Sequence, residues 1–147
     1  MFKRILVTTD GSELSGKAVD QAIGLARALG AELFALKVVH LRSEDRWDGA
    51  LIHEHDALVK LEAQQTLLAQ NVVDAVKASA LAAGVQVTAL TVKSASVADA
   101  VIDLAKKKEC DLIVMASHGR RGLARVLLGS ETQHVLTHSQ IPVLVLR

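Results

Sequence analysis

Five short apolar runs alternate with four longer amphipathic segments along this chain, and this alternation restricts the folds that it can adopt. We predict strands over residues 5–9, 33–39, 85–91, 112–115 and 143–146, separated by helices that begin near residues 12, 52, 96 and 130. Four strand–helix units and a last strand are typical of an α/β fold, with a parallel sheet covered by helices on both faces. The third run alternates apolar and polar residues, as an edge strand does, which favours a doubly wound, flavodoxin-like order of 3-2-1-4-5.

The helices carry their own boundary signals. We expect serine caps at Ser12 and Ser96, and a Ser-x-x-Gln capping box from Ser130 to Gln133 at the start of the fourth helix. The second helix is predicted from about Ile52 to Ala83. Its inward-facing stripe is predicted to consist of Leu58, Leu61, Leu68, Val72 and Val76.

Composition limits the class of protein. A chain of 147 residues is expected to form one domain over 1–147, and its core must be aliphatic because aromatic residues make up only 2%. A net charge of +1 argues against nucleic acid as a partner, and no apolar stretch reaches the 18 residues of a membrane span. The single cysteine, Cys110, excludes an internal disulfide, and together with the lack of a signal-peptide layout it suits a cytoplasmic location.

The loop between the fourth strand and the fourth helix is rich in glycine. Gly119 and Gly129 lie in it together with Arg120 and Arg121, and Ser130 follows. Glycines let the backbone approach a ligand closely, and a helix N-terminus offers unpaired N–H groups and a partial positive charge. This combination indicates an anion site, above all for a phosphate. We expect at least one arginine of Arg120, Arg121 and Arg125 to face the phosphates.

The end of the first strand is a second candidate segment. Asp10 follows that strand directly, and in the order 3-2-1-4-5 the topological switch lies between strands one and four. Ligands of such sheets bind at the carboxyl ends of the strands near this switch. We therefore expect Asp10 and the glycine loop to meet in one crevice, although Asp10 also suits a turn and helix cap.

The spacing in the loop resembles the nucleotide-binding signature of the universal stress protein family. That signature is Gly-x-x-Gly, nine residues, then Gly-Ser or Gly-Thr, and the chain matches it at Gly119, Gly129 and Ser130, with Ala116 at the first glycine. The segments Ile5–Ser12, Leu36–His40, Asp111–Met115 and Ile141–Val145 extend the resemblance over nearly the whole chain. A glycine-only backbone at Ala116 would cost about 1–3 kcal/mol.

The resemblance implies an ATP-binding regulatory module of the stress response. In the family, the residue equivalent to Asp10 lies at the nucleotide and the backbone equivalent to that of Val38 meets the adenine. ATP, AMP or ADP would bind, with Mg²⁺ offsetting the phosphate charge. The implied nucleotide-binding residues are Thr9, Asp10, Val38, Met115, Ala116, Ser117, His118, Gly119, Arg120, Arg121, Gly129, Ser130 and Glu131.

Other motifs fit less well. Gly11 to Lys17 resembles a P-loop, but Ala18 stands where the Mg²⁺-binding hydroxyl should be. His53-Glu54-His55-Asp56 lacks a second histidine on the same helical face, so we interpret it as a solvated helix entrance without metal. A receiver domain needs an acceptor aspartate after the third strand, and a dinucleotide enzyme needs Gly-x-Gly-x-x-Gly after the first. The chain has neither.

Two other functions stay open beside the regulatory one. One is a slow ATPase, although no catalytic residue is evident in a position to orient an attacking water. The other is a dimeric interaction module that binds no nucleotide.

The last strand predicts a homodimer. Val143 to Leu146 is apolar, has Pro142 only at its entrance and is followed by no helix. An unprotected edge strand of this kind is usually covered by another chain, here through an antiparallel, two-fold pairing of the strands 143–146. The family resemblance implies the same dimer.

Overall fold

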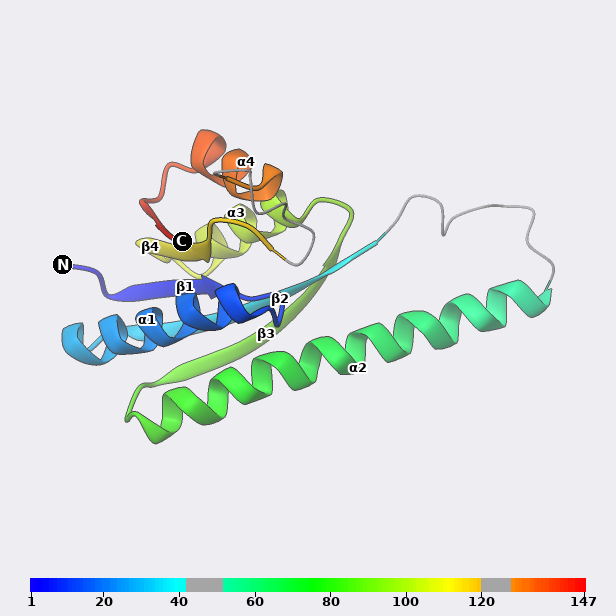
Figure 1. Cartoon of the computed structure of the whole chain (residues 1–147), viewed down its shortest axis with the longest axis horizontal. Coiled ribbons are helices and arrows are strands. Elements are labelled where there is room, and N and C mark those ends of the chain that lie inside the picture. Colours follow the sequence, from blue (N-terminus) through cyan, green and yellow to red (C-terminus); the bar gives the residue numbers. More distant parts are fainter. Residues whose placement is uncertain (42–51, 120–127) are drawn as a thin grey trace.

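The computed structural model describes residues 1–41, 52–119 and 128–147 as a five-stranded parallel sheet in the order β3-β2-β1-β4-β5. The strands are β1 (Arg4–Thr8), β2 (Glu32–His40), β3 (Val87–Ser94), β4 (Leu112–Ala116) and β5 (Val143–Leu146). The helices are α1 (Glu13–Leu29), α2 (Ile52–Ala82), α3 (Val97–Lys107) and α4 (Ser130–His138), and they lie on both sides of the sheet (Figure 1). The predicted fold class and the order 3-2-1-4-5 are confirmed.

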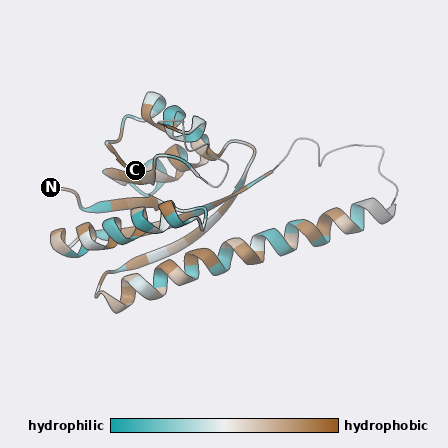
Figure 2. Ribbon diagram, viewed as in Figure 1, coloured by the Kyte–Doolittle hydropathy of each residue, from teal (hydrophilic) through white to brown (hydrophobic). Residues whose placement is uncertain are grey.

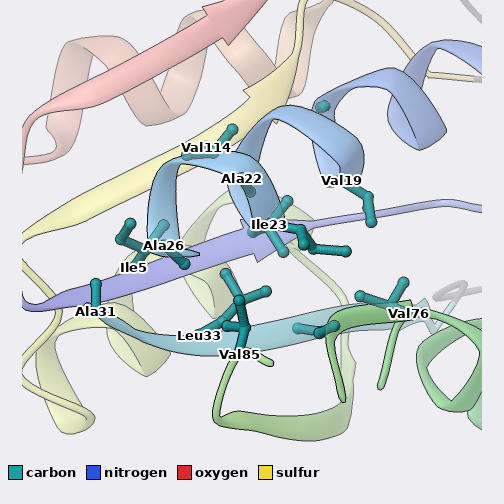
Figure 3. Close-up of a cluster of buried hydrophobic side chains, with 14 of the residues drawn as sticks. Ile5, Val19, Ala22, Ile23, Ala26, Ala31, Leu33, Val76, Val85 and Val114 are labelled. Carbon is teal, nitrogen blue, oxygen red and sulfur yellow. The ribbon is translucent and has the colours of Figure 1, made fainter. Parts of the chain in front are cut away.

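Each central strand is buried on both faces, which explains the continuous apolar runs. In β1, Leu6 lies between Phe34 of β2 and Ile113 of β4. Alternate residues of the strands enter two separate cores. The side chains of Ile5, Leu33 and Val114 pack with those of α1 and the C-terminal half of α2 (Figure 3). Those of Leu6, Leu36 and Met115 pack with α3 and α4 on the other face.

The serine caps predicted at Ser12 of α1 and Ser96 of α3 are confirmed. Ser12 Oγ accepts a hydrogen bond from Ser15 N–H, and Ser96 Oγ accepts one from Asp99 N–H. These bonds satisfy amide donors that have no partner within the helix. The cap at Ser12 turns the chain sharply after β1, so that the start of α1 stays beside the end of that strand.

The predicted capping box at α4 is wrong. Gly129 is the N-cap, with no side-chain cap, and Ser130 is the first helical residue. The Gln133 side chain donates from Nε2 to the carbonyl of Leu128 at 3.0 Å, so it cannot return to the backbone of Ser130. The helix begins one residue earlier than the box requires, and the N–H of its N-cap, Gly129, donates to the carbonyl of Ser117, the residue after β4.

The predicted inward stripe of α2 is wrong in part. Leu61 and Leu68 are 49% and 58% exposed, although Val76 is buried. The residues that face the sheet, here called the sheet-facing stripe, are Ala69, Val73, Val76 and Ala80. The N-terminal half of α2 extends past the sheet (Figure 1), and apolar residues recur along its whole length (Figure 2). Within the described ranges, no helix is long and apolar enough to cross a membrane.

Candidate functional site

The end of β1 is held by a local network of hydroxyl and carboxylate groups. Thr9 is buried, and its Oγ1 lies 3.0 Å from Oγ of Ser15, which is also buried. Asp10 Oδ1 accepts a hydrogen bond from Ser12 N–H at 2.9 Å, and Thr9 Oγ1 accepts one from Gly11 N–H at 3.2 Å. These contacts fix the direction in which the Asp10 carboxylate leaves the strand. Ser15 was not predicted, although a serine one turn into a capped helix is a modest signal for such a contact.

At the end of β4, Ala116 occupies an ordinary strand position. It pairs with Leu146 of β5 and is 8% exposed. Among the described non-glycine residues, a positive φ occurs only at Glu109, so Ala116 is not in a glycine-only conformation. The cost considered for an alanine at this point of the signature therefore does not arise.

The two strand ends meet where the sheet order reverses. A methyl group added to Gly119 would lie 2.6 Å from Asp10 Oδ2, closer than real Cβ contacts come. The φ of Gly119 is not in the left-handed region, so space rather than backbone conformation requires a glycine here. The predicted meeting of Asp10 with the glycine loop is therefore present in the structure.

The second signature glycine lies against the same loop. Gly129 N–H donates to the carbonyl of Ser117 at 2.7 Å, and a Cβ on Gly129 would lie 3.4 Å from Cα of His118. His118 is half-buried, with Nδ1 3.2 Å from Oγ of Ser117. The segment from Ser117 to Gly119 thus passes beside the N-terminus of α4. The exposed Ser130 is the first residue of that helix, so the site has amide donors on one side and a carboxylate on the other.

Two side chains fix the N-terminal turn of α4 in place. Thr132 is buried, and its Oγ1 donates to the carbonyl of Ala116 at 3.0 Å. Glu131 Oε2 accepts a hydrogen bond from Ala98 N–H of α3 at 2.8 Å. The Glu131 carboxylate therefore contacts the start of a neighbouring helix, and its predicted role at a nucleotide is untested. Sequence reasoning missed Thr132 because one threonine inside a helix carries no distinctive signal.

The backbone N–H and C=O groups of Val38 in β2 point toward the space beyond the C-terminal end of β1. The last hydrogen bond between β1 and β2 joins Thr9 N–H to the carbonyl of Leu36 at 3.0 Å. Backbone groups in a strand point alternately to its two neighbours, so those of Val38 point to the same side as those of Leu36. Since β1 ends at Thr8, the N–H and C=O of Val38 face the space beyond the end of that strand.

The structure describes only some of the other residues that were predicted at binding or metal sites. Met115 is 6% exposed and its side chain packs in the core of α3 and α4, so this side chain is not exposed at the site. Arg120, Arg121 and Arg125 lie outside the described residues. The same holds for the side chains of His53 and Glu54, whereas His55 and Asp56 are exposed. Within the described part of the chain, no three metal-binding side chains come together.

Cys110 is buried before β4, away from the site. The pKa of its thiol is raised from 9.0 to about 11, mainly by burial and secondly by the negative charge of Asp111. A thiol with this pKa stays protonated at neutral pH and is a poor nucleophile. The interpretation of Cys110 as a packing residue agrees with this environment.

Comparison with known proteins gives matches over the whole chain. The model of the universal stress protein family matches residues 1–147. Universal stress protein MJ0531 of Methanocaldococcus jannaschii is 35% identical over 153 residues, covering 100% of this chain and 83% of that protein. The structure of hypothetical protein MJ0577 superposes with a TM-score of 0.85 at 27% identity, covering 99% and 96% of the two chains. A universal stress protein in complex with cAMP superposes with a TM-score of 0.71 at 29% identity, covering 99% and 97%.

Proposed function

Because this chain belongs to the universal stress protein family, we propose that it is an ATP-binding regulatory module with its nucleotide between the ends of β1 and β4. One observation carries the proposal: Gly119 lies so close to the Asp10 carboxylate that no side chain fits between them, beside the N-terminus of α4. A related structure in complex with cAMP supports an adenine nucleotide as the ligand class.

The phosphates would lie on the amide groups near Gly119 and in the first turn of α4, which starts at Ser130, because the N–H of Gly129 already donates to the carbonyl of Ser117. A helix N-terminus favours negative charge there, and Ser130 Oγ is exposed and able to add a hydrogen bond. The Asp10 carboxylate would repel a phosphate placed directly against it. It fits this site if it accepts a hydrogen bond from a ribose hydroxyl. It also fits if it faces a phosphate-bound Mg²⁺, because Mg²⁺ prefers oxygen ligands such as carboxylates.

The adenine would lie beyond the end of β1. There the backbone N–H and C=O of Val38 present one donor and one acceptor side by side. The edge of an adenine ring carries an acceptor nitrogen beside an amino donor, so the two patterns are complementary. This part of the site would bind ATP, ADP and AMP alike, and the triphosphate would be distinguished at the glycine loop.

Regulation fits the described residues better than fast catalysis does. The groups near the site are Asp10, which already accepts from Ser12 N–H, and His118, which is paired with Ser117 Oγ. Neither contact is that of a base poised to orient an attacking water. We expect hydrolysis far below the roughly 1 s⁻¹ of an ordinary kinase, and steady-state turnover at that rate would favour the ATPase alternative.

Denaturing the purified protein and chromatographing the supernatant tests the proposal directly. We expect ATP or AMP to be released, or ATP with Mg²⁺ to give binding heat on titration. Gly129→Glu should weaken this binding by well over tenfold, because a carboxylate would occupy the phosphate position. Gly129→Gln is the matched control, since it adds the same bulk without the charge and should retain more of the affinity.

An empty supernatant with no binding heat would leave the dimeric interaction module as the function. Equal loss of affinity in the glutamate and glutamine variants would mean that the position matters for shape and not for phosphate charge. Unchanged affinity in a folded Gly129→Glu protein would refute the phosphate assignment.

The proposal includes a homodimer through β5. This strand pairs only with β4 among the described strands, and Leu144 on it and Leu136 on α4 are each 40% exposed. The N–H of Ile113 in β4 donates to the carbonyl of Pro142, and the N–H of Ser117, the residue after β4, donates to the carbonyl of Leu146. By alternation, the backbone groups of Val143 and Val145 point to the open edge, where a second β5 could pair with them.

Val145→Pro removes an outward-facing amide and spares the ladder between β4 and β5. Light scattering behind a size-exclusion column should therefore show that the strand-mediated dimer is lost while the protein stays folded by circular dichroism. Leu144→Ala is the control, since it trims a side chain and keeps every backbone donor. A wild-type monomer at tens of micromolar, or a mass that Val145→Pro leaves unchanged, would count against this seam.

A cytoplasmic location also belongs to the proposal, because the buried, protonated Cys110 suits a reducing compartment.

A further inference from the structure

Helix α2 carries most of the large apolar side chains that are exposed in the described chain. Eight such side chains are exposed across all the described residues. Five of them belong to α2: Val59, Leu61, Leu67, Leu68 and Leu81. A soluble domain usually buries such a concentration against another surface. The sheet-facing stripe of α2 is already covered, so these side chains are available for a separate contact.

Some of these residues belong to a second stripe with coiled-coil spacing. Starting at Leu58, apolar or neutral residues follow at alternating intervals of three and four. This outer stripe consists of Leu58, Leu61, Gln65, Leu68, Val72 and Ala75. At about 3.6 residues per turn it lies roughly a quarter of a turn around the helix from the sheet-facing stripe. Leu58 and Val72 are half-buried and the other four are exposed, so the stripe is open to solvent. A repeat of this kind fits a second helix packed along it.

The flank of the outer stripe on the side away from the sheet carries a charge only at its outer edge. Ala57, Gln64, Asn71 and Ala78 occupy that flank, and all four are exposed. On the other flank, Glu62 already binds Lys93 of β3, with Nζ 2.9 Å from Oε1. Asp56 and Asp74 lie on the far side of the helix by the same periodicity, whereas Lys60 lies at the outer edge of the flank, on the same line of the helix as Ala78. A charged partner would therefore find only Lys60 to complement on this flank, whereas in a second, antiparallel copy of this helix Lys60 lies at about the level of Asp74 and meets no like charge.

The stripe is complementary to itself in the antiparallel direction. A two-fold axis between Gln65 and Leu68 would place Leu58 opposite Ala75 of the second copy and Leu61 opposite Val72. Large side chains then face smaller ones in those layers, and Gln64 faces Asn71 on the flank, where the two amides can hydrogen-bond. This axis lies near the middle of α2, which runs from Ile52 to Ala82, so the two helices would overlap along most of their length.

We propose that two copies of this chain associate through α2, packed antiparallel along the outer stripe. The contact is separate from the β5 seam and does not depend on nucleotide. A single helix pair is smaller than the about 1,600 Å² of a standard interface, so the association is weak and concentration-dependent. If the β5 dimer also forms, the two contacts together give tetramers or longer assemblies.

Sedimentation equilibrium over a range of protein concentrations tests the proposal. Leu61→Glu with Leu68→Glu places charges in the centre of the contact and should raise its dissociation constant at least about a hundredfold. Leu67→Glu with Leu81→Glu is the matched control, because these leucines are 63% and 56% exposed on the same helix but outside the outer stripe. The control should associate like the wild type. Both variants alter exposed positions, and circular dichroism will show that they fold.

Spin labels test the direction of packing. In a Cys110→Ala background, single cysteines at Gln64 and Ala57 are labelled separately, and distances between copies are measured by pulsed electron resonance. Antiparallel packing separates the two labels by about 8 Å along the axis at Gln64 and about 29 Å at Ala57. Equal distances at both positions would overturn the antiparallel arrangement. Superimposed mass–concentration curves for the wild type and the Leu61→Glu, Leu68→Glu variant would overturn the contact itself, whatever happens at β5.

Discussion

Replacing Gly119 with alanine tests the closest approach in the candidate site. The new methyl group would lie 2.6 Å from Asp10 Oδ2 and 3.6 Å from Asp10 Cγ, and these are the only contacts within 4 Å that the described residues make outside its chain neighbours. The backbone can accept alanine, since φ is not in the left-handed region. The clash must therefore be relieved by moving the Asp10 carboxylate.

The cost follows from what Asp10 loses when it moves. Its hydrogen bond from Ser12 N–H, 2.9 Å long, joins a carboxylate to a backbone amide. Such a bond contributes about 1.5–3 kcal/mol, and the lower end applies because Asp10 is half-buried. Replacing glycine with alanine also stiffens the unfolded chain, which stabilises the protein by about 0.4–1 kcal/mol. We expect the unfolding free energy to fall by about 1 kcal/mol, a Tm decrease of about 2–4 °C for a domain of this size.

Gly129→Ala is the matched control. Its methyl group would lie 3.4 Å from Cα of His118, an ordinary contact. We expect its unfolding free energy to stay within about 0.5 kcal/mol of the wild type. Urea unfolding followed by circular dichroism gives both values, and ATP titration should show a loss of affinity for Gly119→Ala that exceeds the loss for Gly129→Ala.

A double-mutant cycle with Asp10→Ala can refute the reasoning. Without the carboxylate, the described residues offer the new methyl group no close contact, so Gly119→Ala should be neutral or slightly stabilising in that background. If Gly119→Ala costs the same with and without Asp10, the close approach of the two residues does not decide the need for glycine.

Three further expectations concern single residues. Thr132→Val removes the donor to the buried carbonyl of Ala116 and should lower the unfolding free energy by about 1–2 kcal/mol in urea; no change would show that the bond does not hold α4 in place. Ala116→Gly should cost about 0.5–1 kcal/mol without improving ATP affinity, because the residue is in an unstrained strand; a gain in affinity on titration would contradict this. The pKa of Cys110, raised to about 11 in the folded protein, means that the unfolded chain loses its thiol proton first above pH 9.0, so stability should fall between pH 9.0 and about 11. A Cys110→Ala protein should lack that part of the pH dependence measured by urea unfolding, and identical profiles for the two proteins would refute the assignment.

The candidate site was predictable in its location and less so in its fine contacts. Asp10 and Gly119 are far apart in sequence, yet the order of the strands places both at the switch point, where they touch. The roles of Thr132 and Glu131 were not predictable, because their hydrogen bonds go to Ala116 and Ala98 on other elements. No local pattern records such partners.

The sequence alone determined the elements, their order in the sheet and the end of the sheet at which Asp10 and Gly119 come together, because short apolar runs, glycines and caps act through neighbouring residues. Only the tertiary structure decided which face of α2 is buried. In α2 the aliphatic residues follow two stripes, and local periodicity cannot distinguish the stripe that meets the sheet from the stripe that stays exposed. Val73 and Ala80 lie against the sheet while Leu61 and Leu68 do not, because the helix crosses β2 and β3 with only its C-terminal half and small residues allow the closer packing there.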